Sequence, residues 1–250
     1  MPYWRVHSKA RSHRVAIEGQ YRGASAYLVG GSPRLLDLDL RLLRLPGCWT
    51  MAINNAAVIF EPDCFIALDT ARCFNFNVFS NPRILKLINY SRHDEMISGR
   101  RLSHYPNTLF FNLDDEVKSP MWEFCRLDGP LPFWRNTFFT ALAALYQLGF
   151  RQVFLIGCTF ETNIGSYAHQ GEIRDSDRTA NQELYDDTVD KLRQLVPMVR
   201  DEGMSISTCH PDSPLDGVVP YVPFEESVSR VVIDSTSVEF NDYKHVSQTD

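Results

Sequence analysis

The sequence predicts an α/β protein: a Rossmann-like, doubly wound sheet of mostly parallel strands, with helices on both faces and one lid-like insertion. Three observations predict this fold. Short apolar runs that stop at a small or polar residue alternate with helical patterns, the segments between them are short, and no internal repeat appears. Strands that are buried on both faces read as such continuous apolar runs, and their alternation with helices indicates parallel pairing.

The first expected core strand is 26–29, which ends at Gly30. The runs 49–53 and 64–68 are likewise apolar and stop at a polar residue, and further strands are expected at 108–113, 151–156 and 204–208. Helical periodicity occurs in three segments, which are 84–90, 137–148 and 181–200. Pro197 is expected to kink or end the last of these helices. The leucine-rich segment 35–45 predicts a short helix or a pair of turns.

Length and composition are those of an ordinary globular protein. The chain has 250 residues, of which 44% are hydrophobic and 22% are charged, and its formal net charge is −6. A net negative charge of this size excludes electrostatic binding of nucleic acid by the protein surface as a whole. We expect one domain over 25–231, preceded by a basic arm or short edge element at 1–24 and followed by a flexible tail at 232–250.

The targeting and cysteine patterns predict a cytoplasmic protein. The first residues lack the apolar region of a signal peptide, and no run reaches the length of a transmembrane segment. The 6 cysteines are scattered without a C-x-x-C pair. They therefore indicate neither a zinc site nor a disulfide framework.

The turn after the first strand is the first candidate site. Gly30, Gly31 and Ser32 precede Pro33. Glycines let a backbone approach a phosphate, and the amide groups of the next turn receive it. The alternative interpretation is a plain tight turn. The chain has neither a G-x-S-x-G elbow nor a P-loop, which excludes hydrolases of that type and ordinary NTPases. It also lacks G-x-G-x-x-G at this turn, which counts against a dinucleotide oxidoreductase.

Several short patches, in order between about residues 26 and 226, resemble two related families. The patches are LVGGSP at 28–33, AINN at 52–55, PD at 62–63, LD at 68–69, NT at 136–137, LGF at 148–150, VFLIG at 153–157 and GSY at 165–167. One family is the single-domain bacterial sialyltransferases that use CMP-sialic acid. The other is the MptE-like group, with archaeal pterin pyrophosphokinases and phage and bacterial surface-polysaccharide proteins. The resemblance implies a nucleotide-binding transferase.

The resemblance implies that the nucleotide phosphates lie at the first turn. Gly30, Gly31 and Ser32 would line them. Asn54 matches an asparagine that holds the nucleotide-sugar in the sialyltransferases, and we assign its neighbour Asn55 to the same donor site.

Further donor contacts are implied in the second half of the chain. Asn136 and Thr137 would contact the base or the ribose, and Tyr167 matches a tyrosine that grips a phosphate oxygen. Two positions depart from the sialyltransferase pattern: Thr159 stands in place of an aspartate, and Glu161 stands in place of a second tyrosine. We keep Thr159 in the expected donor site.

Asp69 is a candidate catalytic and metal-binding residue. A carboxylate at the end of a buried strand, beside a glycine-rich turn, would bind Mg²⁺ that bridges a diphosphate, or would orient a ribose hydroxyl. The alternative is a helix N-cap before Ala71. The MptE-like group has the pattern Pro-Asp…Asp, which is found here as Pro62-Asp63 and Asp69. Mg²⁺ is therefore the candidate cofactor.

The catalytic base is open between three residues. The sialyltransferases carry a histidine just ahead of the second long helix, and this chain has none there. His169, in a polar loop after the central strand, would take over its role, and Asp175 and Asp177 are the rival bases. Arg135 and Arg174 would neutralise a leaving diphosphate, or remain solvated.

The turn after the last core strand is a further candidate. Its position suits a nucleotide-lining turn, with Ser213 on the base or the phosphate. His210 and Asp212 in the same turn would be metal ligands, although two ligands without further partners are weak evidence.

Together these residues favour a glycosyltransferase that moves a sugar from a nucleotide-sugar donor to an acceptor hydroxyl, with the aromatic-rich segment 116–135 as a lid. The acceptor would be a glycan or, given the basic arm and the phage members of the resembled group, a modified DNA base. One alternative is an Mg²⁺-dependent pyrophosphokinase that uses the nucleotide triphosphate ATP, and another is a catalytically degenerate nucleotide-binding protein. An exposed aromatic surface would form a homo-oligomer interface, and its residues are Trp122, Phe124, Phe133 and Trp134.

Overall fold

The computed structural model describes residues 4–8, 11–74, 76–114, 121–127, 129–162, 168 and 175–231. Within these ranges, only the backbone is described at 6–8, 11–14, 76, 122, 175–178 and 180. The predicted tail at 232–250, Tyr167, His169 and Arg174 lie outside the described residues.

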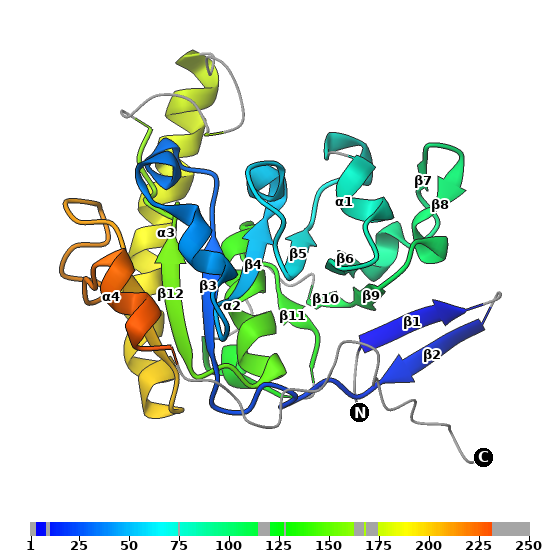
Figure 1. The fold of residues 1–250 in the computed structure, drawn as a ribbon, viewed down its shortest axis with the longest axis horizontal. Helices are drawn as coiled ribbons and strands as arrows, with labels where there is room; N and C mark the ends of the chain where they lie inside the picture. The colour runs from blue at the N-terminus through cyan, green and yellow to red at the C-terminus, as the bar shows by residue number, and fades with distance from the viewer. Residues whose placement is uncertain are drawn as a thin grey trace.

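A nine-stranded sheet forms the centre of the protein, with the strand order β13-β12-β3-β4-β5-β6-β9-β1-β2 (Figure 1). The strands, in chain order, are β1 Trp4–Ser8, β2 Arg11–Val15, β3 Ser25–Val29, β4 Trp49–Ile53, β5 Cys64–Ala67, β6 Leu85–Asn89, β9 Thr108–Phe111, β12 Gln152–Ile156 and β13 Ser205–Thr208. All neighbours from β13 to β9 pair in parallel, whereas β1 is antiparallel to β9 and β2. The predicted α/β fold with a mostly parallel sheet is therefore confirmed.

Helices cover both faces of this sheet. The face that carries Ala26 and Leu28 of β3 packs against α2 (Thr137–Leu148) and α3 (Asp175–Asp201). The other face, which carries Tyr27 and Val29, packs against short helices. These are η1 Pro33–Asp37, η2 Leu40–Arg44, η3 Asn54–Val58, η4 Ala71–Cys73, α1 Phe76–Ser80 and α4 Phe224–Ser229. Because side chains alternate along a strand, each strand contributes to both layers of the core.

The remaining short elements lie in the connections. They are η5 Tyr90–Arg92, β7 Met96–Ile97 paired with β8 Arg100–Arg101, η6 Leu102–His104, β10 Leu113–Asp114 paired with β11 Leu131–Pro132, and η7 Met121–Cys125. No helix among the described residues is long and apolar enough to cross a membrane.

Helix α2 follows the prediction for 137–148. The side chain of Asn136 caps its start by accepting a hydrogen bond from the Phe138 amide at 2.9 Å, and Gly149 ends it at φ 105°. Every residue of α2 is buried. The helix therefore fixes the position of its own first turn, which points toward the carboxyl ends of the strands.

One predicted element was wrong, and one of the two expected effects of Pro197 was not observed. The segment 84–90 forms strand β6 rather than a helix, because β5 and β9 pair with it on both sides and its alternate residues are buried on opposite faces. Helix α3 does not end at Pro197. It continues to Asp201, since Leu195 and Val199, on either side of the proline, are fully buried against the sheet.

The N-terminal segment forms the predicted short edge element. Strands β1 and β2 make a hairpin that joins the sheet where Arg5 and Val6 pair with β9, at the edge remote from α3 (Figure 1). In the predicted lid at 116–135, residues 116–120 and 128 lie outside the described part of the chain, and the described remainder contains η7 and β11.

The predicted aromatic interface was wrong for two of its residues. Phe124 and Trp134 are 1% and 4% exposed. Their ring centroids lie 5.7 Å apart, and Trp134 packs 5.1 Å from Phe139 of α2. These rings therefore belong to the protein core. Phe133 is partly buried, and the side chain of Trp122 lies outside the described residues.

Candidate functional site

The order of the strands creates a topological switch point between β3 and β12. From β3 the chain builds the sheet toward β9, and it later returns to add β12 and β13 on the opposite side of β3. In open α/β sheets ligands bind in the crevice at the carboxyl ends of the strands at such a point. Gly30 and Gly157 directly follow the two strands that flank it.

Gly30 and Gly157 are in close contact. The Gly30 amide donates to Ile156 O at 2.8 Å, and the Ser32 amide donates to Gly157 O at 2.9 Å. A Cβ atom on Gly30 would lie 2.3 Å from Gly157 O, and Gly157 itself has φ 62°. The close approach of two backbones, rather than a phosphate alone, thus requires glycine at position 30.

A cavity of about 460 Å³ opens at this switch point. It brings together most of the residues predicted to bind the nucleotide. Those that line it are Gly30, Gly31, Ser32, Asn54, Asn55, Asp69, Arg135, Asn136, Thr137 and Thr159. These residues come from the ends of β3, β4, β5 and β12 and from the start of α2. Their roles toward a nucleotide stay predictions.

Other predicted site residues are placed elsewhere or are not described. Ser213 is not among the cavity residues, and its hydroxyl accepts a hydrogen bond from the Leu215 amide at 3.4 Å within its own turn. The backbone of Asp175 and Asp177 forms the first turn of α3, but their side chains lie outside the described part.

Three non-glycine residues that line the cavity have left-handed backbone conformations. They are Asn54 (φ 53°), Arg135 (φ 57°) and Phe160 (φ 53°). Such conformations cost about 1–3 kcal/mol each for most residues and are concentrated at functional sites. Asparagine tolerates this conformation better than arginine or phenylalanine does.

Asn54 also presents an unpaired polar atom. Its Oδ1 is buried and accepts no hydrogen bond from the described residues. Strands β3 and β4 are paired up to Val29 and Ala52, and both Asn54, which follows β4, and Gly31, which follows β3, line the cavity. A buried acceptor without a donor is costly. We therefore regard Oδ1 as the most informative ligand-binding atom of the cavity.

Two polar side chains of the cavity are held by neighbouring elements. The Ser32 hydroxyl accepts hydrogen bonds from Thr159 Oγ1 at 2.8 Å and from the Arg34 amide at 3.3 Å. Asn136 caps α2 with its oxygen and donates from Nδ2 to Thr188 Oγ1 of α3 at 2.8 Å. Asn136 is therefore a positioning residue, which joins the start of α2 to α3.

Asp69 and Arg135 both line the cavity and both are exposed. Neither side chain forms a hydrogen bond or an ion pair with any other described residue. The alternative that Asp69 caps a helix is wrong, because Thr70 is the N-cap residue of η4 and Glu95 accepts the Ala71 amide at 2.8 Å. The Asp69 carboxylate is therefore available to a ligand.

Asp69 is the predicted metal ligand that lines the cavity, and the groups around it decide whether Mg²⁺ fits there. Among the described residues, no three histidine, cysteine, aspartate or glutamate side chains gather as a metal site. Mg²⁺ is commonly held by one or two carboxylates together with substrate phosphates and water. Asp69 fits that partial role and would hold the ion only together with a bound diphosphate.

An ion pair that the sequence did not predict lies beside the phosphate turn. Arg34 Nε lies 2.8 Å from Glu161 Oε1, and the same guanidinium donates to Pro211 O at 2.8 Å and to Asp212 O at 3.2 Å. Arg34 thus ties η1 to the segments that follow β12 and β13. Three segments that are distant in the sequence meet here, and no local sequence pattern predicts their contact.

Aromatic rings form one wall of the cavity. Phe160 packs edge-on against Phe138 at 4.9 Å and against Tyr185 at 5.8 Å between ring centroids. All three residues line the cavity. They were not predicted, because each reads as an ordinary core residue of its own segment. An aromatic wall of this kind suits a base or a sugar ring.

His210 supports the floor of the site, and among the described residues it belongs to no group of three or more metal-ligating side chains. Its Nε2 accepts the Gly157 amide at 2.6 Å, and the residue is 4% exposed. Burial, followed by the charge of Arg34, lowers the pKa of His210 to about 4. The neutral imidazole therefore holds the glycine at the switch point.

This geometry predicts a pH dependence of stability. Because the folded pKa lies below the usual value of 6.5, the unfolded chain binds more protons between these values, and the free energy of unfolding falls as the pH drops from about 6.5 to 4. We expect a loss of up to about 3 kcal/mol from this group. Chemical denaturation as a function of pH measures it. In His210→Gln, which keeps an acceptor but does not titrate, this component should disappear; an unchanged profile would contradict the assignment.

Comparisons of the chain with protein-family models, with curated proteins and with solved structures returned no significant match.

Proposed function

We propose that the protein is a nucleotide-dependent transferase, and specifically a glycosyltransferase that takes a sugar from a nucleotide-sugar donor. The observation that carries the proposal is the switch-point cavity, which is lined both by the Gly30–Gly31 turn and by Asn54, whose buried Oδ1 has no partner among the described residues. The volume of about 460 Å³ lies within the range of small-molecule sites.

The phosphates of the donor would lie between the first turn and the start of α2. The amides of Gly30 and Ser32 already bond to the backbone of β12 and its end, whereas the Gly31 amide donates to no described residue and would donate to a phosphate oxygen. Thr137 opens α2, whose N-terminal amides and dipole favour an anion. Arg135, next to this helix start, would neutralise the departing nucleotide.

The reaction itself needs one base and one leaving group. The base takes the proton of the acceptor hydroxyl, the oxygen attacks the anomeric carbon, and the bond from that carbon to the nucleotide phosphate breaks with its electrons leaving on the phosphate. His169, Asp175 and Asp177 stay the predicted bases. A glycan hydroxyl is the proposed acceptor, and a modified DNA base is the second candidate acceptor.

A screen of ligands tests this function. The melting temperature of the protein would be measured with CMP-, UDP- and GDP-sugars and with ATP, each with and without Mg²⁺, and released nucleotide would be quantified by chromatography. The proposal predicts stabilisation by one nucleotide-sugar and slow release of its nucleotide. Binding of a bare nucleotide without turnover of any nucleotide-sugar would instead indicate a nucleotide-binding protein without transferase activity.

The exposed carboxylate of Asp69 favours one second candidate, an Mg²⁺-dependent diphosphotransferase. Here Asp69 would hold the ion against the phosphates of ATP, and AMP would be released as the diphosphate moves to a hydroxymethyl acceptor. Asp69→Asn should abolish that activity but only weaken a metal-free glycosyl transfer. AMP release that requires both Mg²⁺ and Asp69 would therefore favour this candidate over the first.

A further inference from the structure

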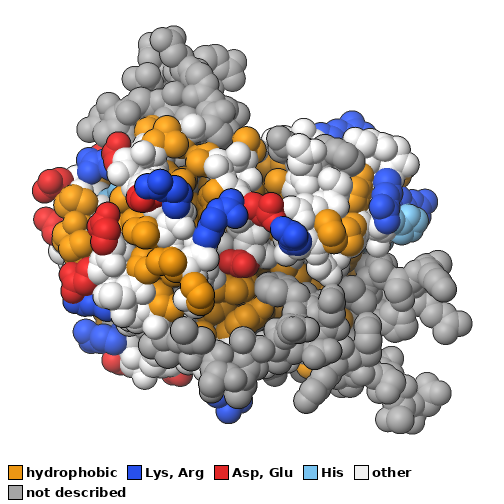
Figure 2. All heavy atoms as spheres, viewed as in Figure 1, with side chains coloured by type: hydrophobic (Ala, Val, Ile, Leu, Met, Phe, Trp, Pro, Cys, Tyr) orange, Lys and Arg blue, Asp and Glu red, His pale blue; other side chains and the backbone are white. Residues whose placement is uncertain are grey.

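A second cavity, of about 520 Å³, lies at the amino ends of the central strands, on the edge of the sheet opposite the switch point. It opens between η2, the first residues of β4, the segment 60–63 before β5, and Arg83 ahead of β6. On the face shown in Figure 2, a row of basic and acidic side chains runs above a hollow with apolar side chains in it. The proposed function makes no use of this cavity.

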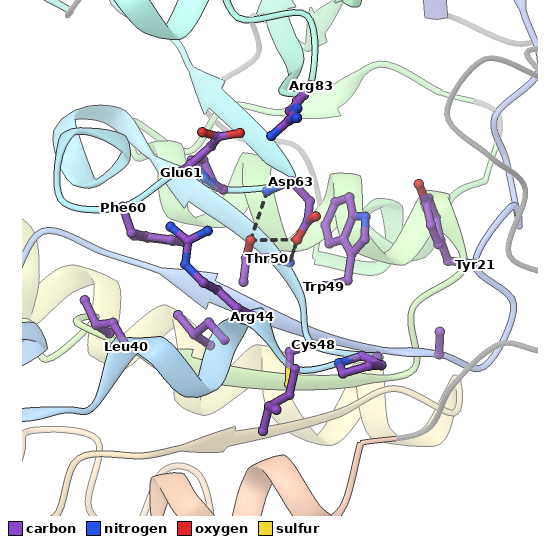
Figure 3. Close-up of a pocket in the computed structure, with 16 residues that line it drawn as sticks. Tyr21, Leu40, Arg44, Cys48, Trp49, Thr50, Phe60, Glu61, Asp63 and Arg83 are labelled. Atoms are coloured by element: carbon purple, nitrogen blue, oxygen red, sulfur yellow. Dashed lines mark hydrogen bonds between the residues drawn. The ribbon is translucent and has the colours of Figure 1, made fainter.

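A desolvated carboxylate forms the floor of this cavity. Asp63 Oδ2 accepts two hydrogen bonds from Thr50, from its amide at 2.8 Å and from its hydroxyl at 2.8 Å, and Thr50 Oγ1 accepts the Asp63 amide at 3.0 Å (Figure 3). No basic group of the described residues lies within ion-pair distance, and burial raises the pKa of Asp63. The second carboxylate oxygen has no partner among the described residues, and it would accept ligand hydroxyls.

Unpaired donors also line this cavity. The indole Nε1 of Trp49, which lines the cavity, is buried and donates to no described residue. Arg44 and Arg83 also line the cavity, and their guanidinium groups make no hydrogen bond or ion pair with other described residues. In Figure 3, Arg44 and Arg83 approach Asp63 from different sides, with Glu61 beside Arg83. The mouth of the cavity thus carries two unpaired guanidinium groups and one exposed carboxylate, that of Glu61. This excess of positive charge favours an anionic group of the ligand.

The walls are partly aromatic. Trp49 is fixed by Phe150 at 4.6 Å and by Tyr21 at 5.2 Å between ring centroids, and Phe60 lies on the opposite side of Asp63 (Figure 3). Rigid rings beside a carboxylate suit the apolar face of a sugar ring whose hydroxyls bond to that carboxylate. An ammonium ligand would meet the two arginines as like charges, so hydroxyl groups are the better donors for Asp63.

We propose that this cavity is a second binding site, for a monosaccharide unit that carries one anionic substituent, a phosphate or a carboxylate. The ring hydroxyls bond to Asp63, and the anion lies between Arg44 and Arg83. This site is separate from the nucleotide cavity. It would hold an acidic saccharide on the far edge of the sheet whatever reaction the switch point performs.

The test is isothermal titration of the full chain with glucose 6-phosphate, glucuronate, glucose and inorganic phosphate. We expect saturable binding of at least one of the two acidic sugars, and the stronger of them identifies the anion. Arg44→Gln and Arg83→Gln should each weaken it about tenfold, the effect of one charge-assisted hydrogen bond. Asp63→Asn should weaken the binding of the acidic sugar and of glucose alike. The melting temperature of this variant would show that it folds.

Arg41→Gln is the matched control, because Arg41 lies on the same short helix, pairs with Asp39 and has a side chain that is 88% exposed. It should leave the affinity within about twofold of wild type. Asn54→Asp, in the other cavity, should also leave it unchanged. The proposal is overturned if neither acidic sugar binds, if Arg44→Gln and Arg83→Gln behave like Arg41→Gln, or if inorganic phosphate binds as tightly as glucose 6-phosphate.

Discussion

Replacing Gly30 by alanine is expected to destabilise the protein by about 3 kcal/mol or more, which places the variant near or beyond the limit of folding. The added Cβ would lie 2.3 Å from Gly157 O and 2.8 Å from Cys158 Sγ. Both neighbours are buried and directly follow β12, which is paired with β3, so they have little room to move away. Urea denaturation of the two proteins measures the difference.

The matched control is Gly129→Ala. A Cβ at Gly129 would meet only the side chain of Arg126, at 3.4 Å, and this side chain can move aside. The control should change the free energy of unfolding by less than about 1 kcal/mol. Equal effects of the two substitutions would mean that the close contact of Gly30 with Gly157 does not hold the switch point together.

Replacing Asn54 by aspartate is expected to weaken binding of the nucleotide donor about 100-fold. The substitution keeps the shape of the side chain, and aspartate, like asparagine, tolerates the left-handed conformation of this residue. The substitution replaces the neutral side-chain amide with a negatively charged carboxylate near the predicted phosphate turn. Repulsion between this carboxylate and the negative phosphates costs several kcal/mol. Isothermal titration with the best nucleotide-sugar from the ligand screen measures the loss.

Two comparisons separate charge from shape at this position. Asn54→Gly removes the side chain without backbone strain, so its stability should stay within about 0.5 kcal/mol of wild type while its affinity falls about tenfold. The nucleoside without phosphates should bind to Asn54→Asp almost as well as to wild type. An aspartate variant that loses the nucleoside and the nucleotide-sugar equally would contradict a phosphate position next to Asn54.

The sequence predicted the fold well where local patterns and tertiary packing agree. The strand runs at 49–53 and 151–156 and the capped helix α2 are examples, since most of their residues are apolar and their ends carry the expected stop signals. The pattern failed at 84–90. Leucine and isoleucine with one lysine suit a helix locally, but two neighbouring strands offer the segment hydrogen bonds on both sides.

The candidate site could be predicted in part for a related reason. Residues at the carboxyl ends of parallel strands meet at one edge, so Gly30, Asn54 and Asp69 could be assembled from the order of the strands. The pair of Arg34 with Glu161 could not be predicted, because it depends on how three connections fold back over the sheet. The cavity around Asp63 was missed as well, since it lies at the opposite edge, where ligands are not expected.

The most direct test of the central claim is the NMR spectrum of the ¹⁵N-labelled protein during titration with the best nucleotide-sugar. The account predicts that the largest shift changes occur at the amides of Gly31, Asn54, Thr137 and Thr159, which line the cavity between β3 and β12. Shift changes that centre on Trp49, Thr50 and Asp63 instead, or that appear at none of these amides, would contradict a nucleotide site at the switch point.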